Sequence, residues 1–160
     1  MKRKQMLCAL ILSLAMLVTL TGCIIIPIPK RYEIALEDVS SIGIYDLRDR
    51  DHYYPSEEAL AYTIEEDQME DFLQDLSDVP FTDIIIIVLA SIDPSFGYGD
   101  WTVRINYTDS SYTYISCGGY GTTHDADGNL IDSNHYSCDT DEWEAFIEKY
   151  VPQDIFYGQE

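Results

Sequence analysis

Positive charge is scarce in this 160-residue chain, which has 9 Lys and Arg residues against 29 Asp and Glu residues. Three of the nine, Lys2, Arg3 and Lys4, lie at the N-terminus, and the others are scattered along the chain. Proteins bind the phosphates of nucleic acid with clustered Lys and Arg side chains. We therefore expect no nucleic acid as a partner. The acidic excess favours a solvated surface, and binding of a cation or a basic partner is the functional alternative.

The chain also lacks the short motifs of common enzyme classes. It has no Gly-x-Ser-x-Gly, no phosphate-binding loop, no dinucleotide-binding glycine pattern and no His-Glu-x-x-His. We therefore assign no catalytic residue and favour a binding protein over an enzyme. A small two-carboxylate hydrolase of the cell envelope stays open, because the fold sets the geometry of such a pair and leaves little trace in the sequence.

No apolar run is long enough to span a bilayer comfortably, since a membrane-spanning helix takes about 20 residues. The run Met6–Thr19 follows the basic N-terminus and is typical of a removable signal. The run Ile84–Leu89 is shorter and rich in β-branched residues, with Asp93-Pro94 soon after it. It predicts a buried central strand.

The segment Leu20-Thr21-Gly22-Cys23 matches a bacterial lipobox at all four positions. The N-terminus therefore resembles that of bacterial lipoproteins, and the layout of the chain resembles small members of that class. The resemblance implies a signal peptide over residues 1–22, lipid on the Cys23 thiol, and anchoring at the extracytoplasmic face of the cell membrane. An uncleaved signal anchor is the alternative. Cleavage would take the formal charge from −20 to −23.

Residues 23–31 are expected to form a short tether between the lipid and the folded body. Pro27 and Pro29 favour extended backbone there. The remaining residues 32–160 suit one compact domain.

Two segments have the apolar spacing of amphipathic helices. The first is predicted over Ile64–Ser77, because Thr63 and Glu66 form a capping box before the periodic residues. The second is predicted over Asp141–Tyr150, capped by Asp139 or Thr140. The apolar positions are Met69, Phe72, Leu73 and Leu76 in the first helix, and Trp143, Phe146, Ile147 and Tyr150 in the second.

Alternating apolar residues predict strands over Ser40–Leu47 and Trp101–Tyr107. A turn at Thr108–Ser111 joins the latter strand to Tyr112–Cys117 in a hairpin. The polar segment Arg48–Glu58 is expected to be a loop. Together these elements predict an α+β fold, with an antiparallel sheet of about five strands and two amphipathic helices packed on one face.

Thirteen tyrosines make the chain unusually rich in a residue that offers a large contact area at low entropic cost. Strand propensity is the ordinary explanation of this number. As the functional explanation, we expect a surface that binds an envelope protein, peptide or glycan, near the loop Asp93–Asp100. Its candidate residues are Phe96, Tyr98, Trp101, Tyr112 and Tyr114.

The cysteines Cys117 and Cys138 are expected to form a structural disulfide. A two-residue turn at Asp127-Gly128 would pair them in a non-hydrogen-bonded position, and the same register would pair His124 with Ile131. An extracytoplasmic location permits the bond. Two free thiols are the alternative, and a bulge at Gly118-Gly119 would shift the register.

A calcium site is the alternative function for Asp125, Asp127 and Asn129, whose oxygen atoms alternate along the chain. The match to a calcium-binding loop is partial, because Leu130 and Tyr136 stand where such a loop has Gly and Glu. An ordinary hairpin turn explains the same residues. We therefore expect no cofactor, with calcium as the alternative.

Overall fold

The computed structural model describes residues 23–48, 55–88, 100–118, 121–134 and 136–158, with the backbone alone at 23–27 and 84–88. The signal segment and two of the predicted contact residues, Phe96 and Tyr98, lie outside the described residues. In the described part of the chain, no helix has the length and apolar character to cross a membrane.

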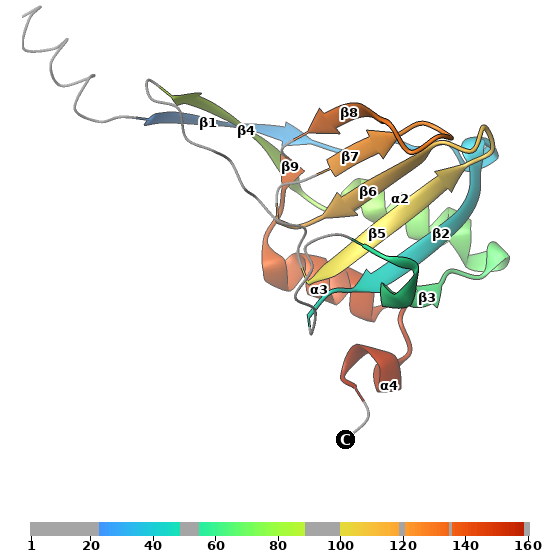
Figure 1. Cartoon of the computed structure of the whole chain (residues 1–160). Coiled ribbons are helices and arrows are strands. Elements are labelled where there is room, and N and C mark those ends of the chain that lie inside the picture. Colours follow the sequence, from blue (N-terminus) through green and yellow to red (C-terminus); the bar gives the residue numbers. More distant parts are fainter. Residues whose placement is uncertain (1–22, 49–54, 89–99, 119–120, 135, 159–160) are drawn as a thin grey trace, which may run out of the picture.

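The predicted α+β class is confirmed, with a six-stranded antiparallel sheet as the main element (Figure 1). Its strand order is β3-β2-β5-β6-β7-β8. The strands are β2 (Val39–Asp46), β3 (Leu60–Thr63), β5 (Trp101–Tyr107), β6 (Tyr112–Ser116), β7 (Gly121–His124) and β8 (Leu130–Asn134). The predicted hairpin is present, because β5 pairs with β6 across the turn that follows Tyr107.

A second sheet has three antiparallel strands in the order β1-β4-β9, namely β1 (Cys23–Lys30), β4 (Phe81–Val88) and β9 (Tyr136–Ser137). Residues 23–30, within the segment expected to be a short extended tether, form a strand that pairs with β4 along its whole length. Pro27 and Pro29 fit this position, since β1 is an edge strand and proline cannot donate a hydrogen bond to a second neighbour. Figure 1 shows the β1–β4 pair projecting away from the six-stranded sheet.

Three α-helices complete the described fold: α2 (Met69–Asp78), α3 (Thr140–Glu148) and the short α4 (Gln153–Phe156). Single 3-10 turns lie at Leu36–Asp38, Glu57–Ala59 and Glu66–Gln68. Figure 1 shows α2 and α3 on the same face of the six-stranded sheet, as predicted.

The start of α2 differs from the prediction. Thr63 belongs to β3, so it cannot cap a helix, and the helix begins at Met69 after a 3-10 turn. Gln68 at the N-cap makes no side-chain cap bond. The acidic residues Glu70 and Asp71 lie in the first turn, where the helix dipole favours negative charge. By contrast, the predicted cap of α3 is confirmed, because the Asp139 carboxylate accepts from the Asp141 N–H at 2.9 Å.

The core lies between the sheet and the two helices. Its fully buried members from the sheet include Ile42, Ile44, Val103, Ile105 and Ile115, and those from the helices include Phe72, Leu76, Trp143 and Ile147. The Trp143 indole N–H donates to the Trp101 carbonyl oxygen at 2.9 Å. This bond ties α3 to the first residue of β5.

Candidate functional site

A cluster of aromatic and cationic side chains lies on the sheet face opposite the core, and no described α-helix covers that face (Figure 1). This face is partly covered all the same, because Leu47 and Ala59 pack there with Tyr45 and Tyr114 in a second buried cluster. Side chains of a strand alternate between the two faces, so the burial of Val103 and Ile105 in the core places Arg104 on the other face. Strand pairing then places Tyr114 beside Arg104, and His124 beside Tyr112. We call the set Tyr45, Arg104, Tyr112, Tyr114 and His124 the tyrosine face.

Arg104, Tyr112 and His124 form a layered stack. The Arg104 guanidinium carbon lies 4.1 Å from the centroid of the Tyr112 ring. The His124 ring lies 4.9 Å from the same ring, at an interplanar angle of 7°. Because β6 lies between β5 and β7, the two side chains contact Tyr112 from opposite sides. Both faces of the Tyr112 ring are therefore in contact with other side chains of the protein.

Tyr114 supports this stack from the side. Its ring meets Tyr112 edge to face at 5.4 Å and Tyr45 at 6.1 Å. The His124 ring is held by its nitrogens, with Nδ1 3.2 Å from the Gly128 carbonyl oxygen and Nε2 3.1 Å from the Thr122 hydroxyl. Because the contacts within the protein hold these side chains in place, a ligand would pay little entropy to order them.

Arg104 has no acidic partner in this arrangement. Among the described residues, no carboxylate lies within ion-pairing distance of it. Its Nε atom is buried and has no hydrogen-bond partner. Its terminal amino groups also make no hydrogen bond with the described residues, and the side chain as a whole is half-buried. A charged donor without a partner is costly unless something outside the protein satisfies it.

The predicted contact residues divide into three groups. Tyr112 and Tyr114 belong to the tyrosine face, where Tyr112 is half-buried and Tyr114 is buried, and Phe96 and Tyr98 lie outside the described residues. Trp101 is a correction: it is 1% exposed and stacks on Phe156 at 5.2 Å and 3°, so it belongs to the core.

Sequence reasoning missed Arg104, although a signal was present. Arg104 is the only Lys or Arg between Arg50 and Lys149. It also occupies a polar position in the alternation of β5, which places it on the same face as the tyrosines of β6.

The β7–β8 hairpin follows the predicted register but not the predicted turn. Gly121 pairs with Asn134 as expected. The loop, however, is closed by the Gly128 N–H donating to the Asp125 carbonyl at 3.0 Å, with Gly128 at φ +83°. This longer loop shifts the pairing by one residue, so His124 faces Leu130. Ile131 is then an extra residue in β8, and this bulge restores the predicted register beyond it.

The two cysteines face each other across this hairpin. The Cys138 N–H donates to the Cys117 carbonyl at 3.4 Å, and Gly118 pairs with Ser137. Their position is therefore a hydrogen-bonded one and not the non-hydrogen-bonded one expected, and the two cysteines do not lie at disulfide distance. The structure has both as free cysteines. Burial raises the pKa of the Cys138 thiol to about 12 and also raises the pKa of Cys117.

The candidate calcium residues are organised as a turn. Asp125 Oδ1 accepts from the Asp127 N–H at 3.0 Å and from the Asn129 N–H at 2.8 Å, and Oδ2 accepts from the Asn129 amide at 2.9 Å. The hydrogen bond from the Asn129 side chain lowers the pKa of Asp125. Within the described residues, no three His, Cys, Asp or Glu side chains are grouped to hold a metal ion. Turn formation accounts for these three residues.

Replacement of Asp125 with alanine is expected to lower the free energy of unfolding by about 1 kcal/mol, because the turn loses its side-chain acceptor. Asp127→Asn is the matched control and is expected to be nearly neutral, since no acceptor role falls on its side chain in the turn. Thermal unfolding with and without calcium, in added monovalent salt, measures both effects. A saturable calcium stabilisation that is lost in Asp127→Asn would contradict the assignment as a turn.

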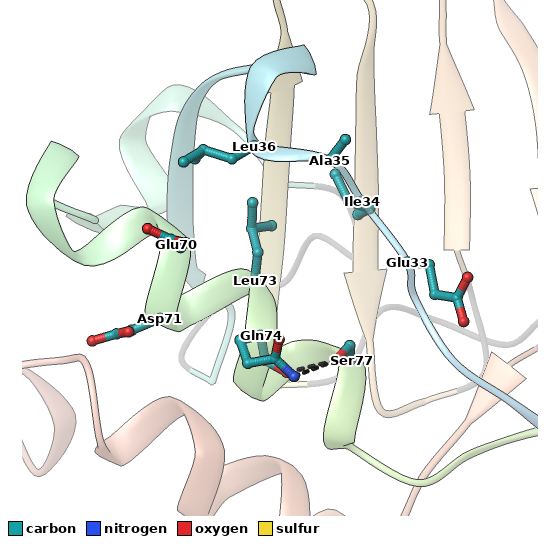
Figure 2. Close-up of a pocket in the computed structure, with 9 residues that line it drawn as sticks. All are labelled: Glu33, Ile34, Ala35, Leu36, Glu70, Asp71, Leu73, Gln74 and Ser77. Carbon is teal, nitrogen blue, oxygen red and sulfur yellow. Dashed lines mark hydrogen bonds between the residues drawn. The ribbon is translucent and has the colours of Figure 1, made fainter.

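A groove of about 590 Å³ lies between residues 33–36 and α2 (Figure 2). Its apolar wall includes Ile34 and Leu73, and its acidic residues are Glu33, Glu70 and Asp71. Figure 2 shows Glu33 on the opposite side of the groove from Glu70 and Asp71, which both come from α2.

Comparison of the chain with protein-family models, curated proteins and solved structures finds no match.

Proposed function

We propose that the chain is a lipid-anchored, non-catalytic binding protein of the bacterial cell envelope, and that it binds an envelope component on the tyrosine face. The observation that carries this proposal is the stack of Arg104 on Tyr112 and Tyr114, with a guanidinium that has no acidic partner in the described structure. Aromatic side chains that are held in place beside an Arg side chain are typical of binding surfaces.

The anchoring part of the proposal is supported by the lipobox at the N-terminus. Cleavage there would make Cys23 the first residue of β1, paired with Val88 at the end of the projecting β-ribbon. In this arrangement a paired strand, and not a free tether, would connect the lipid to the folded body.

Photo-crosslinking in cells tests the binding role. Leu60 is a suitable position for a photoreactive amino acid, because it is 44% exposed and lies beside Gly43, which pairs with Arg104. Glu70 on α2 is the control position, since it is exposed and lies on the other side of the sheet. We expect an added mass at position 60 that is absent at position 70.

Two outcomes decide this experiment. The adduct at position 60 should be lost when Tyr112 is replaced with alanine in a protein that still folds, as checked by circular dichroism. Identical adducts at positions 60 and 70, or an adduct at position 60 that survives Tyr112→Ala, would contradict a binding role for the tyrosine face.

A disulfide between Cys117 and Cys138 is part of the proposal, because an extracytoplasmic location favours oxidation of facing thiols. We expect non-reducing mass analysis of the protein from the envelope to show this linkage. We also expect Cys138→Ser to lower the free energy of unfolding by about 2–4 kcal/mol. Two thiols that react with an alkylating reagent in the native protein would contradict the linkage.

A further inference from the structure

We propose that Arg104 anchors a single carboxylate group of a small ligand whose remaining part is uncharged, an inference that rests on the proposed binding role of the tyrosine face. The first argument compares the two stacked arginines. Arg48 also lies over an aromatic ring, 4.5 Å from the centroid of Trp101. Its guanidinium pairs with Asp46 at 2.8 Å and donates to the Phe156 carbonyl at 2.7 Å. Arg104 makes no such bond with the described residues.

The absence of a partner for Arg104 is notable because acids outnumber bases 29 to 9 in this chain. The neighbours of Arg104 across the sheet are Gly43 and Tyr114, neither of which carries a charge. Among the described residues, therefore, no carboxylate neutralises this positive charge.

The geometry selects the kind of anion. The guanidinium carbon of Arg104 lies over the Tyr112 ring, 4.1 Å from its centroid, and 5.7 Å from the centroid of the Tyr114 ring. The Arg104 residue is half-buried, so a ligand would reach its terminal amino groups from the exposed part of the side chain. A carboxylate matches this fork with two parallel N–H···O bonds.

The charge of the whole chain selects against larger anions. At a formal charge of −20, the protein repels polyanions and multiply charged phosphates. A ligand with one carboxylate and no other charge is repelled least by the acidic protein. Its carboxylate can still form a complete contact with Arg104. An uncharged ring or chain can also contact the exposed Leu60 side chain beside this position.

Nitrogen NMR of the arginine Nε–H signals tests the proposal on the full chain, purified in a non-ionic detergent. The probes are benzoate, its neutral counterpart benzamide, and inorganic phosphate, added at constant ionic strength. We expect benzoate to shift the Arg104 signal with saturation below about 10 mM, which is a typical weak affinity for one charge-assisted contact. The Arg48 signal is the internal control and should stay in place, because its Nε already donates to Asp46 at 3.0 Å.

Variants complete the test. Arg104→Lys keeps the positive charge but loses the two parallel N–H donors of the guanidinium group. We expect this variant to bind benzoate at least about tenfold more weakly. Arg48→Lys should leave benzoate binding unchanged. Four results would overturn the proposal. Benzoate could shift the Arg104 and Arg48 signals equally, or shift neither signal up to about 50 mM. Benzamide could bind as tightly as benzoate, or phosphate could bind more tightly than benzoate.

The outcome is separable from that of the crosslinking experiment. Adducts at position 60 that depend on Tyr112, together with an unmoved Arg104 signal, would leave the binding role in place and overturn the carboxylate. A saturable Arg104 shift without any adduct would support the carboxylate site and contradict the envelope partner.

Discussion

Replacement of Trp143 with alanine is expected to lower the free energy of unfolding by about 3–5 kcal/mol, a large part of the 5–15 kcal/mol typical of a domain. Trp143 is fully buried at the centre of the core. Its ring contacts Phe81 at 5.8 Å and Phe146 at 5.4 Å, so removal leaves a cavity between α3 and the sheet. Its indole N–H also donates to the Trp101 carbonyl oxygen, which would lose this partner.

Urea unfolding followed by circular dichroism measures this loss. Trp143→Phe separates the two contributions, because it keeps most of the ring contacts and removes only the indole hydrogen bond; its expected cost is about 1–3 kcal/mol. Glu142→Ala, at the neighbouring exposed position, is the matched control and should change stability by less than about 0.5 kcal/mol. A loss below about 1 kcal/mol for Trp143→Ala would contradict the position of Trp143 in the core.

Replacement of Cys23 with alanine is expected to abolish lipid attachment completely, since the thiol is the atom that would carry the lipid. The variant should incorporate no labelled fatty acid, and it should stay unprocessed or leave the membrane fraction. Cys8, which lies inside the apolar run, offers the matched control. Cys8→Ala removes a thiol from the same segment and should leave acylation unchanged. Acylation of Cys23→Ala at the level of the original protein would contradict the lipobox assignment.

The elements that local sequence determines were predicted closely. The strand β5 has the predicted bounds, because its alternation of apolar and polar residues is a property of adjacent positions. The cap of α3 by Asp139 was also predicted, since a capping side chain acts on the backbone only two or three residues away. Helix α2 began later than expected because β3 uses Thr63 in pairing with Gly43, which is distant in sequence.

The candidate site depended more on tertiary structure. The sequence predicted Tyr112, Tyr114 and Trp101 as surface candidates, but Tyr114 is buried with Tyr45 and Ala59, and Trp101 is buried against Phe156. The sequence gave no sign of the burial of Trp101, because Phe156 comes from α4 near the other end of the chain. The sequence also did not indicate that residues 23–30 pair with β4, because the two strands are distant along the chain.

By itself, the sequence determined the α+β class, the period of β5, the cap of α3 and the polar side of β5 on which Arg104 lies, because each of these follows from residues close together along the chain. Only the tertiary structure decided that β6 lies between β5 and β7, and this order brings Arg104, Tyr112 and His124 into one stack. Strand order reflects which packing of the whole chain buries most apolar surface, and no local pattern contains that information.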